Sequence, residues 1–293
     1  MELQWPLILF TSFMAWSAGL FGTQGVYALR GQAKRAQMPA LFTALGLMIV
    51  GGIAVFLHLQ HWERIFNGFG HLSSGITQEL IAIVVMAVVM VIFFIYLRRS
   101  GDDAEIPAWA AIAAIVVALA LLFVMAHSYM MASRPAWNNA TQILSIFGAA
   151  FVMGPGTMAM IASLRGADDA PANGWTNIIG TIVGAITTVT YSVFMAGTGS
   201  MLSDVGYYFD PVGPTRGISE ATTLSAFSGD ALAFTVTALV CSAVAVICAF
   251  VGKKKGNWKL WGAIIAICGF VAAMCLRIVF YHMGASVYPF VDL

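Results

Sequence analysis

Eight apolar stretches dominate the sequence, and each is long enough to cross a lipid bilayer. A helix needs about 20 apolar residues to cross the hydrocarbon layer, and a helix satisfies its own backbone hydrogen bonds in lipid. The stretches lack the short alternating pattern of a membrane β-barrel. The sequence therefore predicts an all-α, polytopic membrane helix bundle that forms a single membrane domain over residues 1–293. The expected transmembrane helices cover roughly 6–29, 39–60, 76–97, 107–131, 140–164, 175–200, 231–251 and 260–283.

The composition agrees with an integral membrane protein. Hydrophobic residues make up 60% of the chain and charged residues 9%, whereas about a quarter of the residues in a soluble domain are charged. The net charge is +1 and the cations form no basic stripe. Nucleic-acid binding is excluded, because its affinity comes mainly from neutralising phosphates. Glu2 and no cation precede the first stretch, which therefore lacks the basic start of a signal peptide and is expected to stay in the protein.

The distribution of Lys and Arg predicts the orientation in the membrane. Ten of the 14 cations lie in the links after the first, third, fifth and seventh spans, three lie in the opposite links, and Arg277 falls within the last span. Cytoplasmic links carry the excess of cations. We therefore expect the N- and C-termini, the 61–75 link and the 201–230 link to face outward.

Ionisable side chains are concentrated in the link after the second span and at the start of the third. His58, Arg64, Asn67 and Glu79 lie close together in the sequence, and ionisable groups at the membrane are costly and usually functional. A carboxylate one turn inside a span suits a proton acceptor. The alternatives are an interfacial histidine bonded to a carbonyl group, and a salt bridge from Glu79 to Arg64 or Arg277 that only joins helices.

The polar groups of the spans gather in their outer halves, and the inner halves contain no Asp, Glu, Lys or His. A route across the bilayer normally uses ionisable residues along its depth, so we expect function from one side only. A one-sided pocket of proton acceptors suits quinol oxidation, which frees two protons. The electrons would then leave to a partner subunit on the outer face. The outer-half residues are His58, Glu79, His127, Tyr129, Tyr191, Arg277, Tyr281 and His282.

Metal or haem binding in this chain is not expected. All five histidines lie in the outer third or outside the bilayer, which excludes a two-haem arrangement and leaves one haem between His58 and His127 as the open alternative. The four cysteines, Cys241, Cys248, Cys268 and Cys275, form no Cys-x-x-Cys pair and are interpreted as small packing residues. We expect no iron–sulfur cluster in this chain.

A family resemblance rests on a few specific residues. They are the run from Trp5 to Thr11 (WPLILFT), His58-Leu59 with Arg64, Phe66 and Asn67, then Glu79, and finally Arg277 with the run from Val279 to Tyr281 (VFY). On these residues the chain resembles the membrane-anchor subunit of the dimethyl sulfoxide reductase type of molybdenum enzyme. The sequence departs from that family at Gln60-His61-Trp62, where the family has Gly-Ser-Pro, and at Gln78 before the glutamate.

The resemblance implies an anchor that binds menaquinol near the outer face and takes part in anaerobic respiration in the bacterial cytoplasmic membrane. Its electrons would pass to an iron–sulfur subunit and then to a molybdopterin catalytic subunit on the outer face. His58 and Glu79 would bind the quinol and accept its protons during oxidation, and Arg64, Asn67, Arg277 and Tyr281 would help to form its pocket. The alternatives are a structural anchor without a quinol site and a polytopic transporter, although the sequence has no clear internal repeat. The long 201–230 link is expected to contact a partner.

Overall fold

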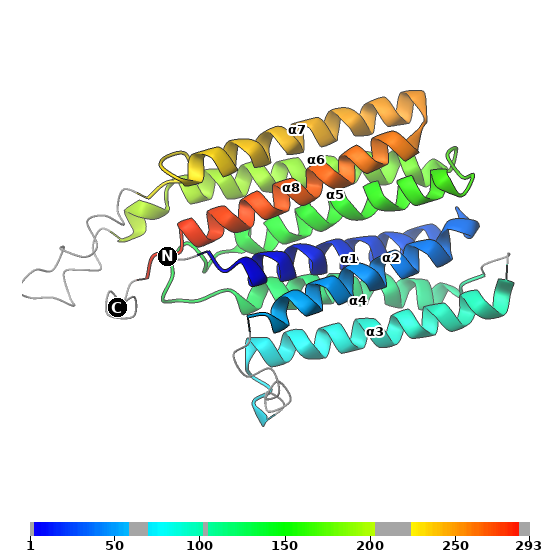
Figure 1. Cartoon of the computed structure of the whole chain (residues 1–293), viewed down its shortest axis with the longest axis horizontal. Helices are drawn as coiled ribbons and strands as arrows, with labels where there is room; N and C mark the ends of the chain where they lie inside the picture. Colours follow the sequence, from blue (N-terminus) through cyan, green and yellow to red (C-terminus); the bar gives the residue numbers. More distant parts are fainter. Residues whose placement is uncertain (1–2, 59–69, 102–104, 203–223, 287–293) are drawn as a thin grey trace, which may run out of the picture.

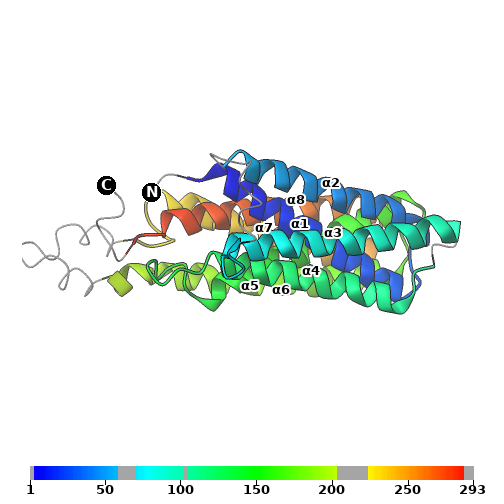
Figure 2. The same cartoon turned by 90° about the horizontal axis from the view of Figure 1, so that it is seen from below.

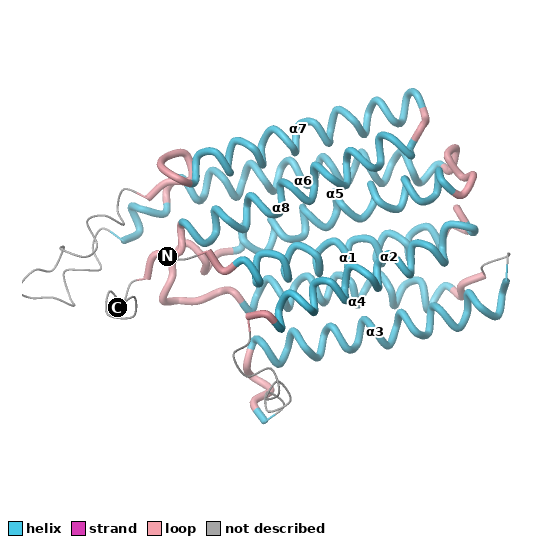
Figure 3. Tube along the Cα trace, viewed as in Figure 1, coloured by secondary structure: helices cyan, strands magenta, loops and turns pink. Residues whose placement is uncertain are grey.

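The protein is a bundle of long helices in the computed structural model (Figure 1), which describes residues 3–58, 70–101, 105–202 and 224–286. The described residues contain eight helices that are long and apolar enough to cross a membrane, and no strand occurs among them (Figure 3). The predicted all-α polytopic fold is confirmed. The helices are α1 (Trp5–Leu29), α2 (Gln37–Phe56), α3 (Gly75–Ser100), α4 (Ala108–Ser128), α5 (Ala140–Leu164), α6 (Pro171–Ala196), α7 (Ala231–Lys255) and α8 (Trp258–His282), with short 3₁₀ turns η1 (Lys34–Ala36) and η4 (Thr198–Leu202).

Boundaries of the second, sixth and seventh spans differ from the expected ones by about one helical turn, and the seventh, expected to end at residue 251, ends at Lys255. The second span was expected to reach residue 60, but α2 ends at Phe56, and the backbone N–H of His58 bonds to the carbonyl of Val55 in a tighter turn. The sixth span begins at Pro171, four residues earlier than expected, because proline is favoured in the first turn of a helix. It ends before Gly197, whose N–H bonds to the carbonyl of Phe194.

The outside of the bundle is apolar, as expected of a surface in contact with lipid. Large side chains from several helices are more than half exposed, among them Ile53, Val88, Val116, Ile186 and Ile247. A soluble protein rarely exposes apolar surface this extensively. Small side chains such as Ala18, Ala114 and Ala150 are fully buried between helices, where they allow close helix packing in lipid. The chain is a multi-pass membrane protein.

The helices form two groups of four with the same packing order. In the first group α1 packs on α2 and α4, and α3 packs on α4; in the second, α5 packs on α6 and α8, and α7 packs on α8. Figure 1 shows α1 to α4 on one side of the bundle and α5 to α8 on the other, and Figure 2 shows the same bundle from below. The halves therefore repeat an arrangement that is not evident in the sequence.

The two halves meet where α1 crosses α5. A Cβ atom added at Gly19 would overlap the carbonyl oxygen of Ala150, and one added at Gly154 would overlap the carbonyl oxygen of Gly19. The two backbones are thus in direct contact, which only glycine allows at these positions. Pro155 follows within α5, and its carbonyl oxygen accepts a hydrogen bond of 3.2 Å from the side chain of Asn177 on α6. Polar and small residues together fix the centre of the bundle.

Candidate functional site

A cavity lies at the end of the bundle where α1 and α3 begin and α2 and α4 end. Its volume is about 380 Å³, within the range of roughly 300–1,000 Å³ that is common for small-molecule sites. His58 and Glu79 both line it, from the end of α2 and the second turn of α3. The rest of the lining is Leu7, Phe10, Val55, Ser74, Gly75, Ile76, Leu80, Ile83, Ser128, Tyr129 and Met131. We call this space the α1–α4 cavity.

Glu79 is the buried polar group of this cavity, with 8% of its surface exposed. The hydroxyl group of Ser128 on α4 lies within hydrogen-bond distance of Glu79 Oε1 and, at 2.9 Å, of the carbonyl oxygen of Met125, so its one proton is donated to Glu79 or shared between the two acceptors. A buried carboxylate needs such donors to offset the loss of water. Glu79 was identified from the sequence as a candidate site residue, but its partner Ser128 was not.

Glycine at position 75 brings α3 and α4 close enough for this bond. A Cβ atom at Gly75 would lie 2.8 Å from the Ser128 Cβ and 3.2 Å from its Cα, which is too close for two carbon atoms without a shift of one helix. The first turn of α3 therefore packs directly on the last turn of α4. This contact sets the position of Glu79 relative to Ser128.

His58 lies at the mouth of the α1–α4 cavity. It follows the last turn of α2 and is exposed, whereas Glu79 is buried deeper in the same space. Ile76, which lines the cavity, is 64% exposed, and the apolar side chains of Phe56 and Leu57, directly before His58 in the chain, are exposed as well. These exposed apolar side chains lie in or next to the helices that are apolar enough to span a membrane.

Arg277 lies behind the α1–α4 cavity and does not line it. Its guanidinium carbon is 5.5 Å from the ring centre of Tyr129, which does line the cavity, and 5.2 Å from that of Phe280. Its Nη1 donates a 3.3 Å hydrogen bond to Gln142 Oε1. Among the described residues no ion pair joins Arg277 to Glu79, so the alternative of a salt bridge between these two side chains is not found there, and Nη1 bonds to a neutral amide.

The other predicted pocket residues fall into two groups. Tyr281 packs in an aromatic cluster, 5.8 Å from the ring of Trp137 and 5.4 Å from that of Phe280, and is not part of the cavity lining. Arg64 and Asn67 lie outside the described residues. The same holds for most of the 201–230 link that was expected to contact a partner.

The remaining histidines of the described spans lie away from the cavity. His127 is exposed on α4 and stacks on Phe123, with ring centres 5.9 Å apart, and His282 stacks on Phe234 at 6.1 Å. His58 and His127 therefore do not line one cavity. Within the described ranges no group of three or more His, Cys, Asp or Glu side chains is arranged to hold a metal ion. The four cysteines are free and lie on α7 and α8.

A second cavity of about 270 Å³ lies between the two halves, on α1, α4, α5 and α6. Its lining is almost entirely apolar, with Phe151, Pro155, Trp175 and Ile179 among the larger side chains and Thr23 and Thr176 as the hydroxyl groups. It contains none of the predicted site residues. We call it the interhalf cavity.

The comparison with protein families gives one match. The model of a family described as a protein of unknown function (DUF4064) matches residues 172–275, which cover α6, α7 and most of α8. The matched residues exclude His58, Glu79 and every other residue of the α1–α4 cavity. No curated protein matches the chain.

Proposed function

We propose that this protein is the membrane-anchor and quinol-oxidising subunit of a multi-subunit molybdenum oxidoreductase of the bacterial cytoplasmic membrane. The observation that carries the proposal is that His58 and Glu79 line one cavity whose other lining residues are mostly apolar. A quinol combines an apolar ring and tail with two hydroxyl groups. It therefore needs an apolar lining and hydrogen-bond acceptors, and the α1–α4 cavity combines both.

The oxidation of a quinol to a quinone releases two electrons and two protons. Glu79, held by Ser128, is placed to accept a hydroxyl proton inside the cavity. His58, exposed at the mouth, is placed to pass protons on to water. The two electrons would leave to an iron–sulfur subunit docked on the outer face, which would hand them to a molybdopterin catalytic subunit. Menaquinol is the quinol that the family resemblance implies.

The membrane orientation supports release of the protons outside. The cavity lies at one end of the bundle, and a group of cations lies at the other end. These cations stand in the last turn of an odd-numbered helix or in the link that follows it, and they include Arg30, Lys34, Arg98, Arg165 and Lys253. Cations mark the cytoplasmic side. Protons and electrons would thus both leave at the outer face.

The proposal is tested in the assembled complex with the variants His58→Ala and Glu79→Gln. Loss of a general base typically slows a reaction about 10²–10⁴-fold, so we expect quinol-dependent turnover to fall at least about 100-fold in each. Turnover with a soluble electron donor that bypasses the quinol should stay unchanged and would show that the complex is assembled. Matched controls are His127→Ala, at similar depth but outside the cavity, and Glu105→Gln at the opposite end. A structural anchor would keep quinol-dependent turnover in all four variants.

A transporter is the second candidate, because the two four-helix groups repeat one packing order. Transporters built from repeats bind their substrate near mid-depth between the halves. The interhalf cavity has that position, and its apolar lining would suit an apolar substrate. Against this candidate, the lining holds no charged side chain that could couple transport to an ion. Uptake of a labelled apolar compound into proteoliposomes, driven by a proton or sodium gradient, would favour it.

A further inference from the structure

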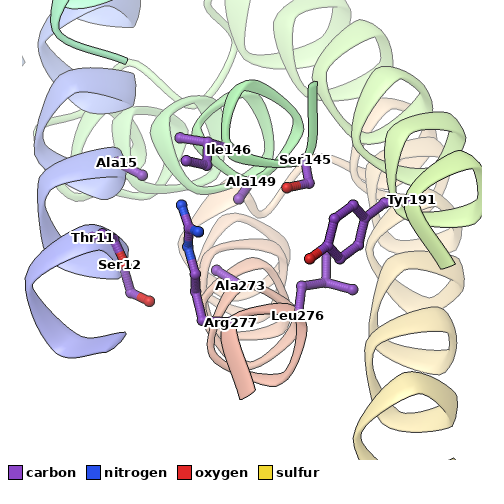
Figure 4. A pocket seen from close by; sticks show the side chains of 10 residues that line it. All are labelled: Thr11, Ser12, Ala15, Ser145, Ile146, Ala149, Tyr191, Ala273, Leu276 and Arg277. Carbon is purple, nitrogen blue, oxygen red and sulfur yellow. The ribbon is translucent and has the colours of Figure 1, made fainter. Parts of the chain in front are cut away.

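Three polar groups without partners meet in a small chamber between α1, α5, α6 and α8. Ser12 Oγ, Tyr191 Oη and Arg277 Nη2 are buried, and no described residue forms a hydrogen bond with any of them. Ser12, Tyr191 and Arg277 are 2%, 1% and 6% exposed. All three line the same cavity of about 20 Å³ (Figure 4), together with Thr11, Ala15, Ser145, Ile146, Ala149, Ala273 and Leu276. We call it the Arg277 chamber.

The chamber has the size of one small ligand. A cavity needs about 10–15 Å³ to hold a single water-sized particle, and this one holds about 20 Å³. Figure 4 shows the Arg277 side chain leaving α8 toward α1 and α5, and the Tyr191 ring leaving α6 toward α8. A polyatomic ligand of several heavy atoms does not fit, whereas a monatomic ion does.

The chemistry of the chamber selects a negative charge. The guanidinium group can only donate hydrogen bonds, and the hydroxyl groups of Ser12 and Tyr191 have their protons free to donate. The other two hydroxyl groups are committed, since Thr11 donates to the carbonyl oxygen of Leu7 at 2.9 Å and Ser145 to that of Gln142 at 2.8 Å. Three donors without a partner therefore line the chamber, and its lining contains no negatively charged side chain.

The charge of Arg277 provides the driving force. A buried charge without a counter-charge is costly, and the partner of Arg277 Nη1 is the neutral amide of Gln142. Glu79, the carboxylate on the other side of Tyr129, is close enough to attract Arg277 electrostatically, but it accepts its hydrogen bond from Ser128 and forms no direct ion pair with Arg277 within the described residues. A small anion beside Nη2 would supply a counter-charge in direct contact with Arg277, in a chamber that the hydroxyl-bearing residues Ser12 and Tyr191 also line.

We propose that the Arg277 chamber binds a single monatomic anion of the halide class, such as chloride, as a structural counter-ion for Arg277. The proposal goes beyond quinol oxidation and does not depend on it. It explains why an arginine is tolerated between transmembrane helices without a carboxylate partner. It also assigns a role to Tyr191 and Ser12, which have none in the α1–α4 cavity.

The first test measures the melting temperature of the purified full-length chain in detergent or nanodiscs. Sodium chloride or bromide replaces sodium gluconate at constant ionic strength, because gluconate is too large for the chamber. A ligand that binds only the folded state stabilises it in proportion to the logarithm of its concentration above the dissociation constant. We expect the melting temperature to rise with the logarithm of the halide concentration above the dissociation constant, and to stay constant in gluconate. Equal melting temperatures in all three salts would overturn the proposal.

Variants assign the effect to the chamber. Tyr191→Phe removes one donor and keeps the ring, and we expect about a 10-fold weaker apparent halide affinity, as for one lost hydrogen bond to a charged group. Arg277→Met should abolish the halide dependence. The matched control is Tyr27→Phe, an equally buried tyrosine whose hydroxyl donates to Asn173 Oδ1 at 2.9 Å, and it should keep the parent affinity. An unchanged affinity in Tyr191→Phe would contradict the assignment.

The second test locates the ion directly and does not require that Arg277→Met folds. Crystals of the full chain grown with bromide should give an anomalous scattering peak between Arg277 Nη2 and Tyr191 Oη. Water only in the chamber, with the bromide peaks elsewhere, would overturn the proposal. Neither test uses quinol oxidation as its readout, so the outcome is independent of the proposed electron-transfer role.

Discussion

Ser128 on α4 donates a hydrogen bond to the carboxylate of Glu79 on α3, at the point where Gly75 brings the two helices into contact. The serine thus connects the one buried carboxylate of the α1–α4 cavity to a second helix. Tyr129 follows directly and separates the cavity from Arg277, whose guanidinium carbon lies 5.5 Å from its ring centre. Glu79 and Arg277 therefore both contact the last turn of α4 or the residue after it.

Replacing Ser128 by alanine should leave the carboxylate of Glu79 in place without its donor. A hydrogen bond to a charged group contributes about 1.5–3 kcal/mol, so we expect quinol-dependent turnover of the complex to change at least about 10-fold. The matched control is Ser100→Ala, whose hydroxyl bonds to the carbonyl oxygens of Tyr96 and Glu105 at the opposite end of α3. Parent-like turnover in Ser128→Ala, together with a parent-like pH profile, would show that the bond has no role in the reaction.

Replacing Gly75 by alanine should separate the first turn of α3 from the last turn of α4. The new Cβ would lie 2.8 Å from the Ser128 Cβ, and such overpacking costs about 1–3 kcal/mol. We expect a lower melting temperature and slower quinol oxidation. Gly46→Ala on α2 is the control, because its Cβ would have no neighbour within 4 Å. Equal melting temperatures of the two variants would contradict the contact.

Replacing Gly154 by alanine should disrupt the crossing of α1 and α5. The Cβ would overlap the backbone of Gly19, and backbone atoms cannot move aside as a flexible side chain can. We expect a larger loss of stability than for Gly75→Ala, measured by thermal unfolding in the same detergent. Gly52→Ala, with open space around its Cβ, serves as the control and should unfold like the parent.

Asp168, in the link between α5 and α6, should make stability depend on pH in the acidic range. Its carboxylate accepts hydrogen bonds from the backbone N–H groups of Asn257 at 2.8 Å and Trp258 at 2.7 Å, at the start of α8. Burial alone would raise the pKa of Asp168, but the hydrogen bonds from Ser163, Trp258 and Asn257 outweigh it and hold the pKa below its usual value.

Because the folded-state pKa is the lower one, the contribution of Asp168 is fully present above the unfolded pKa of about 3.9 and is lost as the pH falls through the folded-state value. Asp168→Asn should lower stability near neutral pH by about 1 kcal/mol, as for a weakened helix cap, and should flatten the acidic dependence. Thermal unfolding from pH 3 to 7 measures both effects. The exposed neighbour provides the control Asp169→Asn, and identical pH profiles of the two variants would refute the cap.

The sequence was sufficient for the fold because hydropathy alone marks membrane helices. All eight expected spans coincide with helices. The errors at Phe56 and Pro171 concern helix ends, because a turn or a proline sets where a helix ends or begins and hydropathy does not. The repeated packing of the two halves could not be predicted, because the halves share the pattern of contacts between their helices but no evident sequence similarity. The convergence of His58 and Glu79 was predictable because only one short link separates their helices.

The partners of these residues could not be predicted from the sequence. Ser128 and Gln142 are uncharged, and such residues in membrane helices usually form packing hydrogen bonds. The one signal for Ser128 was its position beside Tyr129 near the outer end of α4. The sequence offered a salt bridge from Glu79 to Arg277 as one alternative, whereas the described structure gives Gln142 as the partner and leaves Nη2 without one. Spacing along the chain does not encode such contacts between distant helices.

The most direct test of the quinol site is photo-crosslinking of a menaquinone analogue, with a photoreactive group on its ring, to the full-length protein in membranes. Peptide mapping by mass spectrometry would then identify the labelled residues. The account predicts labels on α1–α4 cavity residues such as Phe10, Leu80, Ile83 and Met131, and loss of most of the label in Glu79→Gln. Labels confined to the interhalf cavity, at residues such as Val26, Ile115 or Ile179, would contradict it and would favour the transporter.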